Sequence, residues 1–562
     1  MNRLPQELID RISSFLPKHD LKNILTLTTK FRYAAERYSS AFAEFTINER
    51  NSEKFLALYS GHRLLYLREV IFRPRFSPIF YRYEPELSCR ENADELREKD
   101  ESFTRQIKFL FTTLRSVEEQ AEENHAAGRY RLSIYSPTRL VEAKSSRDCL
   151  HHHYVSWRVH LLNPAELPQI ASVRSLEIHN HGYEYPEWHH HESKLDLRVI
   201  IDLATKLPNL EYLGFQTGGY EWCPTWAEEE PAKHYEHDWE GPRRDARHDF
   251  ASAVTSCSVQ LPSSLKRASM DFLNPLVRTI DIHQGKGLPN LVSPAQTDPF
   301  SSSLRIMSNN LRQLRLRAMV DGSLFWPDND AASFWPNLER LEVMFHIARP
   351  DGKWYFQGPG GEGHNAIGFE ITDAFYPPFE MSELDAEMDA IQEEWGDQRK
   401  NDGNSQFRIT PHQTSLRPLL EGFAKAATRM RSLKQALIWS PLSWFPNDDS
   451  DDESEFDKYD MDDTTDLAWG IAYAEPGLPP GTSLGPEPFD LCPSRQLWWM
   501  VAQWRPDPEL HDLFQRIGRD KHGQELRELW TEDIYGDSLV YRDAMFEEFM
   551  FFHDPGRIPL SR

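Results

Sequence analysis

Cysteine is scarce in this sequence, which has only five cysteines scattered along 562 residues. They are Cys89, Cys149, Cys223, Cys257 and Cys492, and no two of them form a C-x-x-C pair. An odd number of cysteines without paired spacing does not build a disulfide framework, and it favours a reducing compartment. We therefore expect an intracellular protein that is cytoplasmic, nuclear or both.

Long apolar runs and excess positive charge are missing too. A membrane-spanning helix needs roughly 18 or more apolar residues in a row, and no stretch of the sequence approaches this. The N-terminal segment carries charges every few residues and does not read as a signal peptide. There are 63 Lys and Arg against 88 Asp and Glu, a formal net charge of −25. Because phosphate binding needs clustered cations, we expect neither a nucleic-acid nor a membrane partner.

The sequence contains enough apolar residues to form a large core. Hydrophobic residues make up 39% of the chain and aromatic residues 12%, which excludes disorder throughout. At roughly 150 residues per domain, the length fits about three or four domains or one long array of repeats.

The first forty-odd residues predict three short helices. Apolar residues recur at helical spacing from Leu8 to Leu16, after Pro5 and before Pro17. Asp20 is expected to cap a second helix, and a third apolar run extends from Phe31 to Phe45. Three helices of this length bury little surface, so several apolar side chains should stay exposed until a partner covers them.

Strand-like segments alternate with helical ones along most of the remaining chain. Six of them follow a loose Leu-x-x-Leu-x-Leu pattern and begin at Val173, Leu210, Leu265, Leu311, Leu338 and Leu433. This pattern favours an irregular leucine-rich repeat, in which each strand-and-helix unit packs on the next. The spacing is uneven and mostly longer than the roughly 20–29 residues of a regular repeat. An ordinary α/β domain is the alternative interpretation.

Two histidine tracts and a glycine-rich segment are the most prominent candidate sites for chemistry. The tracts, His151–His153 and His189–His191, are contiguous and lack accompanying cysteine pairs, so we expect solvated loops and no metal. The segment Gly358–Gly363 formally satisfies G-x-G-x-x-G, but Pro359 opposes the helix that a dinucleotide loop requires. A hairpin turn followed by a strand over Ile367–Ile371 is the expectation here. No pair of carboxylates stands out as a general acid and base, so we expect no catalysis and no cofactor.

A family resemblance is carried by the N-terminal residues Leu4-Pro5-x-Glu7-Leu8-Ile9-x-x-Ile12, Phe15-Leu16-Pro17, Asp20-Leu21, Leu25 and Thr29-Lys30-Phe31-Arg32. This pattern resembles the F-box, a three-helix module. The remainder is similar to fungal F-box proteins with irregular leucine-rich repeats. The tail from Arg495 to Lys521 resembles an uncharacterised C-terminal domain of such proteins.

The resemblance implies a docking function. F-box proteins bind the Skp-type adaptor of cullin–RING ubiquitin ligases, of the SCF type, and capture a substrate with the rest of the chain. The residues that it implies for adaptor binding are Leu4, Pro5, Leu8, Ile12, Leu16, Pro17, Leu21 and Leu25. We therefore expect a non-catalytic ligase subunit with an unknown protein substrate. An F-box scaffold acting outside the ligase, or a histidine-based metalloenzyme, is the alternative.

The expected organisation is α/β. An F-box over residues 1–45 is followed by an irregular leucine-rich-repeat-like α/β solenoid over 46–445. An acidic loop over 446–466 and a C-terminal domain or cap over 467–562 complete it. The acidic loop contains Ser450 and Ser454, each next to acidic residues, where an acidophilic kinase would add about −1.5 to −2 charge per site. The alternatives are a loop that only improves solubility and an acidic loop that contacts a basic substrate.

Overall fold

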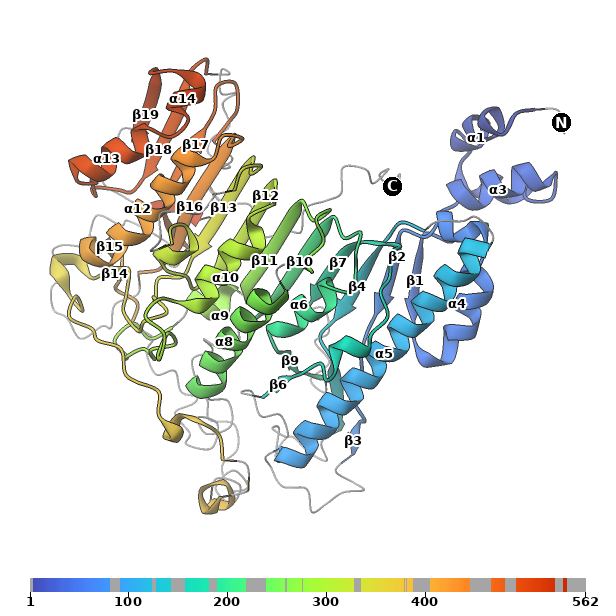
Figure 1. Cartoon of the computed structure of the whole chain (residues 1–562), viewed down its shortest axis with the longest axis horizontal. Coiled ribbons are helices and arrows are strands. Elements are labelled where there is room, and N and C mark those ends of the chain that lie inside the picture. Colours follow the sequence, from blue (N-terminus) through green and yellow to red (C-terminus); the bar gives the residue numbers. More distant parts are fainter. Residues whose placement is uncertain are drawn as a thin grey trace.

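The computed structural model describes residues 4–80, 91–123, 128–142, 157–180, 190–218, 239–257, 260–274, 276–280, 282–327, 335–378, 380, 382–387, 405–444, 466–480, 492–530 and 539–542. They form a mixed α/β structure in which a large, mostly parallel sheet carries helices along one side (Figure 1). Three short helices stand apart from the sheet at its N-terminal end. Within the described residues, no helix combines the length and the apolar character needed to cross a membrane.

The three predicted N-terminal helices are present as α1 (Gln6–Ser14), α2 (Lys18–Ile24) and α3 (Thr29–Tyr38). Pro17, and not Asp20, occupies the N-cap of α2, so that helix begins earlier than expected. The third helix ends at Tyr38 and does not continue to Phe45, because the chain turns at Ser40 with a left-handed φ of 58°. The boundary expected at residue 45 therefore falls inside the first strand of the sheet.

The large sheet begins with parallel strands that lie side by side in the order in which they occur in the chain. They are β1 (Glu44–Ile47), β2 (Glu69–Phe72), β4 (Tyr130–Tyr135), β7 (Val173–His179), β10 (Tyr212–Gly218), β11 (Arg267–Asn274), β12 (Gln313–Ala318), β13 (Arg340–Phe345) and β16 (Gln435–Leu442). The six predicted Leu-x-x-Leu-x-Leu segments are confirmed as strands β7, β10, β11, β12, β13 and β16, and each new strand joins the same growing edge of the sheet.

The Leu-x-x-Leu-x-Leu segments share one register across the sheet. Their fourth positions pair directly from strand to strand as Leu176, Leu213, Ala268, Leu314, Leu341 and Ala436. Their sixth positions do the same as Ile178, Phe215, Met270, Leu316, Val343 and Ile438. All twelve side chains are buried, because alternate residues of a strand point to the same side of a sheet. The fourth and sixth positions of the sequence pattern thus form two apolar rows that run through the core.

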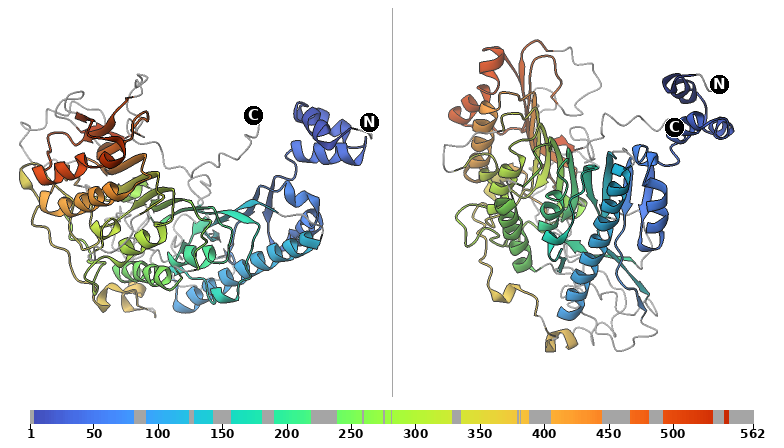
Figure 2. Two further views of the ribbon diagram at one scale, coloured as in Figure 1. Left: turned by 45° about the horizontal axis from the view of Figure 1, so that its top comes forward. Right: turned by 45° about the vertical axis from the view of Figure 1, so that its right-hand side comes forward.

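Helices cover the side of the sheet on which these rows lie, along the outside of its curve (Figure 2). They are α4 (Ser52–Tyr59), α5 (Ala93–Glu123), α6 (Arg198–Ala204), α8 (Glu240–Cys257), α9 (Leu276–Ile280), α10 (Pro299–Ser308) and α12 (Gln413–Arg429). The amphipathic α5 buries Phe103, Ile107, Leu110, Leu114 and Val117, at the helical spacing visible in the sequence.

Short additional strands lengthen several of the intervals between the strands of the large sheet. They are β3 (Ile79–Phe80), β5 (Thr138–Glu142), β6 (Arg158–Val159), β8 (His190–Glu192), β9 (Lys194–Leu195), β14 (Phe356–Gln357) and β15 (Thr410–Pro411). They form small sheets of their own, outside the large one. The longest interval, between β13 and β16, accommodates both β14 and β15.

The C-terminal residues extend the same sheet and the same core. β17 (Leu467–Ala474) and β18 (Arg495–Met500) are antiparallel additions, β19 (Leu526–Trp530) is parallel to β18, and β20 (Val540–Tyr541) pairs with β17. Two helices, α13 (Pro508–Gln515) and α14 (Arg519–His522), connect β18 to β19. The ring of Trp469 lies 6.4 Å from that of Phe345, so the aromatic residues of this segment pack onto the parallel strands.

Candidate functional site

An exposed apolar face lies on the N-terminal helices. We define it by the five large apolar side chains of this unit that face solvent: Leu8, Ile12, Phe15, Leu25 and Leu27. Leu8 is 49% exposed, Ile12 47% and Phe15 78%. Leu8, Ile12 and Phe15 follow one another at helical spacing along α1, and a group of large apolar side chains exposed in this way marks a place where another molecule binds.

The face points outward because other residues hold the helices together. Ile9 on α1 and Phe31 and Ala34 on α3 are buried in a small core of their own, separate from the core of the sheet. Ser13, one turn after Ile9, is buried on the same side of α1. Since residues 9 and 13 occupy the inner side of the helix, residues 8, 12 and 15 lie toward the outer side.

The residues predicted for adaptor binding differ in how far they are exposed. Leu8, Ile12 and Leu25 are exposed on the face, and Pro5 and Pro17 are exposed at the N-caps of α1 and α2. Leu4 and Leu16 are half-buried, and Leu4 packs against the small core.

Leu21 is the exception among the predicted contacts. Its side chain is only 2% exposed, so it supports the interior of the unit and is not accessible for docking as the chain stands. Sequence reasoning did not select Phe15 and Leu27, although both are large apolar residues in a segment too small to bury them. That mismatch between apolar content and available core is the signal that identifies them.

The helical unit is joined to the sheet by a partly buried ionic contact. The Glu36 carboxylate on α3 accepts hydrogen bonds from Arg63 Nη2 at 2.6 Å and from Arg63 Nε at 3.2 Å. His62 Nε2 lies 3.0 Å from the second oxygen of the same carboxylate, and the rings of His62 and Tyr33 are 4.2 Å apart. The Arg63 guanidinium also lies 4.3 Å from the ring centroid of Phe42. These contacts hold the unit against the segment between β1 and β2.

The opposite side of the sheet, away from the apolar rows, carries polar and charged residues. Arg131 Nε lies 3.0 Å from Glu177 Oε1, and Arg315 Nε donates to Glu342 at 2.8 Å. Further along the chain, Arg317 lies 3.7 Å from Asp271. Burial raises the pKa of Asp271 to about 6, although the Arg317 charge lowers it. This side therefore holds mostly buried ion pairs, whereas the apolar helical face exposes its side chains to solvent.

The sites considered for metal binding and phosphorylation are mostly outside the described residues. His151–His153, Ser450 and Ser454 lie there, as does His189, while His190 and His191 begin β8. Within the described part of the chain, no three His, Cys, Asp or Glu side chains gather into a group that could hold a metal ion.

The glycine-rich segment forms a turn, as expected, but the predicted hairpin partner is wrong. Residues Pro359–Gly361 make a short 3-10 turn with Gly360 at φ 73°, and no α-helix follows directly. β14 pairs with β15 rather than with Ile367–Ile371, where Phe369 instead bridges Pro289. The pairing partner comes from more than fifty residues along the chain, which a local pattern cannot reveal.

Comparison of the sequence with models of known protein families gives no match, and comparison with curated proteins gives none.

Proposed function

We propose that this chain is the substrate-recognition subunit of an SCF-type cullin–RING ubiquitin ligase. The exposed apolar face would dock on a Skp-type adaptor, and the sheet would hold a protein substrate. The observation that carries this proposal is the exposure of Leu8, Ile12 and Phe15 on a three-helix unit that is held apart from the main core.

The energetics favour a partner on this face. An apolar side chain contributes roughly 1.5–3 kcal/mol when it passes from full exposure to full burial. Five such side chains on one small unit therefore represent a substantial driving force for association, even though each begins partly covered. Central apolar anchors of this kind supply most of the free energy of protein interfaces.

The rest of the chain supports the substrate-binding half of the proposal. Parallel strands added in chain order, with two in-register apolar rows, fit an irregular leucine-rich-repeat solenoid. Such an array presents an extended side for another protein, which here would be the side of the sheet opposite the apolar rows. No bond chemistry is then required of this chain, because its contribution is to bring the substrate close to the transfer machinery.

Co-purification tests the proposal. The full chain and a Skp-type adaptor are expressed together and the complex is isolated by size-exclusion chromatography. We expect a stable complex with the natural chain and none with a Leu8→Asp, Ile12→Asp double variant. An Ile306→Asp variant is the matched control, since Ile306 on α10 is exposed to a similar extent but lies outside the face. A complex that survives the double substitution would contradict the proposed interface.

A further inference from the structure

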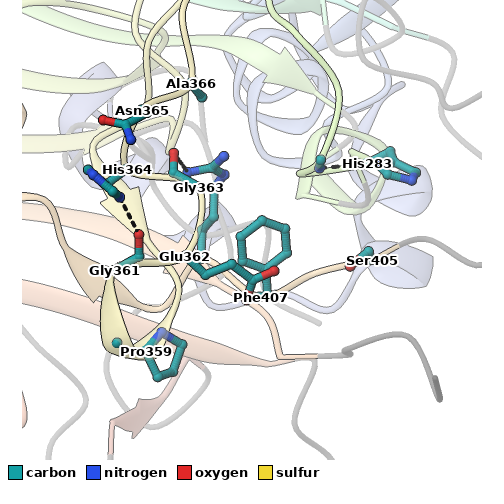
Figure 3. Close-up of a pocket in the computed structure, with 13 residues that line it drawn as sticks. His283, Pro359, Gly361, Glu362, Gly363, His364, Asn365, Ala366, Ser405 and Phe407 are labelled. Atoms are coloured by element: carbon teal, nitrogen blue, oxygen red, sulfur yellow. Dashed lines mark hydrogen bonds between the residues drawn. The ribbon is translucent and has the colours of Figure 1, made fainter. Parts of the chain in front are cut away.

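A pocket of about 810 Å³ lies beside the glycine-rich loop (Figure 3). Three separate segments build it: the turn at residues 283–285, the loop at 359–366 and the stretch at 405–408. Its size falls in the range of roughly 300–1,000 Å³ that suits a small-molecule ligand. The pocket is far along the chain from the docking face, and nothing in the proposed function uses it.

A buried arginine forms part of the wall. Arg408 is only 2% exposed, and its side chain donates to three backbone carbonyls. Nε donates to Gln284 O at 3.0 Å, and Nη1 donates to Phe356 O and to Gly363 O at 3.1 Å each. The guanidinium also lies 4.5 Å from the ring centroid of Trp354 and 5.0 Å from that of Phe407. Backbone and aromatic contacts therefore fix its orientation.

Among the described residues, Arg408 has no ion-pair partner. Within the described residues, no Asp or Glu oxygen lies within ion-pair distance of the guanidinium, and Nη2 has no hydrogen-bond acceptor. Burial lowers the pKa of Arg408 to about 10, so it stays positively charged at neutral pH. A buried charge without an ion-pair contact is costly, and an anion in the pocket would lower that cost.

The loop at residues 359–366 has a backbone conformation that lets it approach Arg408 closely. Gly360, Gly361 and Gly363 all have positive φ, of 73°, 92° and 67°. A Cβ atom at Gly363 would come within 2.5 Å of Arg408 Nη2, so only glycine leaves room for the guanidinium here. The loop thus brings its backbone and the Arg408 charge to the same pocket wall.

Two histidines add polar ring nitrogens to the wall. His364 Nδ1 lies 2.7 Å from Gly361 O, and His283 Nδ1 accepts from Gly285 N–H at 3.1 Å. Because Nδ1 is the acceptor in His283, its neutral ring carries the proton on Nε2, which makes that atom a donor.

One acidic side chain lines the pocket as well. Glu362 is exposed, and its charge acts on Arg408 by raising the arginine pKa against the larger effect of burial. It does not form an ion pair with Arg408, and it would repel an anion bound in the pocket.

We propose that this pocket binds an oxyanion group, a phosphate or a carboxylate, carried by a small molecule. Arg408 supplies the positive charge and the planar donor geometry that such groups need. The volume leaves space for the remainder of the ligand between residues 283–285 and the loop. The negative charge of Glu362 lowers the affinity of the pocket for an anion, whereas the positive charge of Arg408 raises it.

Equilibrium dialysis with labelled inorganic phosphate tests the proposal on the full chain at constant ionic strength. We expect saturable binding at one site. Glu362→Gln should tighten it by roughly threefold to tenfold, because a nearby like charge is removed. Asp373→Asn is the matched control, since Asp373 is also exposed but does not line the pocket. It should change the dissociation constant by less than about twofold, as a screened distant charge does.

Arg408→Gln provides the complementary variant and should weaken binding by at least about tenfold, since charge-assisted hydrogen bonds are lost. If that variant fails to fold, as judged by circular dichroism, the comparison of Glu362→Gln with Asp373→Asn alone decides whether the pocket binds an anion.

Competition with acetate distinguishes a phosphate ligand from a carboxylate ligand. Displacement of phosphate by acetate indicates a general oxyanion site, and no displacement indicates a phosphate site. Direct binding of acetate without phosphate indicates a carboxylate site. Absence of saturable binding of both probes, or equal effects of the two acid-removing variants, would overturn the proposal.

Discussion

Glu36 Oε1 on the last helix of the N-terminal unit lies 2.6 Å from Arg63 Nη2, a residue of the segment that leads into the second strand. The Glu36 side chain is buried, while that of Arg63 is partly covered and also contacts the Phe42 ring. Because the helical unit has its own small core, this contact is one connection between it and the segment that leads into the sheet. It holds the helical unit beside the segment before β2, and it would therefore orient a partner docked as proposed.

Removing the Glu36 charge should loosen the helical unit. We expect Glu36→Gln to destabilise its attachment by about 1.5–3 kcal/mol, the contribution of hydrogen bonds to charged groups. Hydrogen exchange of α1, α2 and α3 should accelerate, while exchange in the strands stays unchanged. Glu53→Gln on α4 is the control, because Glu53 is exposed. Equal acceleration in both variants would contradict the role of the ion pair.

The same contact predicts a response to acid. Burial alone raises the pKa of Glu36, but hydrogen bonds from Arg63 and His62 outweigh it and hold the pKa below the usual 4.5. Since the folded-state pKa is lowered, the stabilisation is present above pH 4.5 and is lost as the pH falls through the folded-state value. The protection factors of the amides in α1 to α3, which compare the measured exchange rate with that of an unstructured chain at the same pH, should fall at acid pH in the natural chain, and less so in Glu36→Gln. Parallel pH profiles for the two proteins would refute this.

The in-register apolar rows should dominate the stability of the sheet. Leu314 is buried between Ala268 and Leu341 on the neighbouring strands, so Leu314→Ala leaves a cavity in the middle of a row. We expect a loss of about 2–5 kcal/mol in the free energy of unfolding. Leu162→Ala, at an exposed leucine, should change it by less than about 0.5 kcal/mol. Urea denaturation of the three proteins measures this, and similar midpoints for both variants would contradict the packing described.

His346 should make the fold sensitive to acid in a separate way. Burial lowers its pKa to about 4, while Nε2 lies 2.9 Å from Thr279 O and Nδ1 accepts from Ala348 N–H. The folded state therefore favours the neutral ring, and this stabilisation is full above pH 6.5 and is lost as the pH falls toward 4. The difference corresponds to about 3 kcal/mol.

Unfolding free energies at pH 7 and pH 4 test that expectation. The natural chain should lose about 3 kcal/mol more than His346→Gln over this range. His19→Gln, at an exposed histidine, should follow the natural chain. If His346→Gln retained the full pH dependence of the natural chain, the buried imidazole would not be its source.

The sequence predicted those features that depend on local periodicity. The Leu-x-x-Leu-x-Leu segments locate the strands because the same two positions of each segment enter the core, whatever the distance between segments. The N-terminal helices follow from their apolar spacing for the same reason. The sequence did not predict which side of α1 faces inward. Ile9 and Leu8 are equally apolar, and only the contact of Ile9 with Phe31 selects between them.

Long-range contacts account for the features that the sequence did not predict. The hairpin expected after Trp354 fails because β14 takes its partner from residues 410–411. The pocket at Arg408 is assembled from three segments that are remote in the chain, and the arginine itself belongs to no motif. The sequence pattern predicts Leu21 as a docking residue, but its side chain is buried inside the small helical unit.

Calorimetric titration of the purified full chain with a purified Skp-type adaptor tests the central claim most directly. The account predicts a one-to-one complex whose affinity falls by about a hundredfold or more in the Leu8→Asp, Ile12→Asp double variant, since two apolar anchors of roughly 1.5–3 kcal/mol each are replaced by charges. The Ile306→Asp control should bind like the natural chain. An absence of binding by the folded natural chain, or equal affinity for the double variant, would contradict the account.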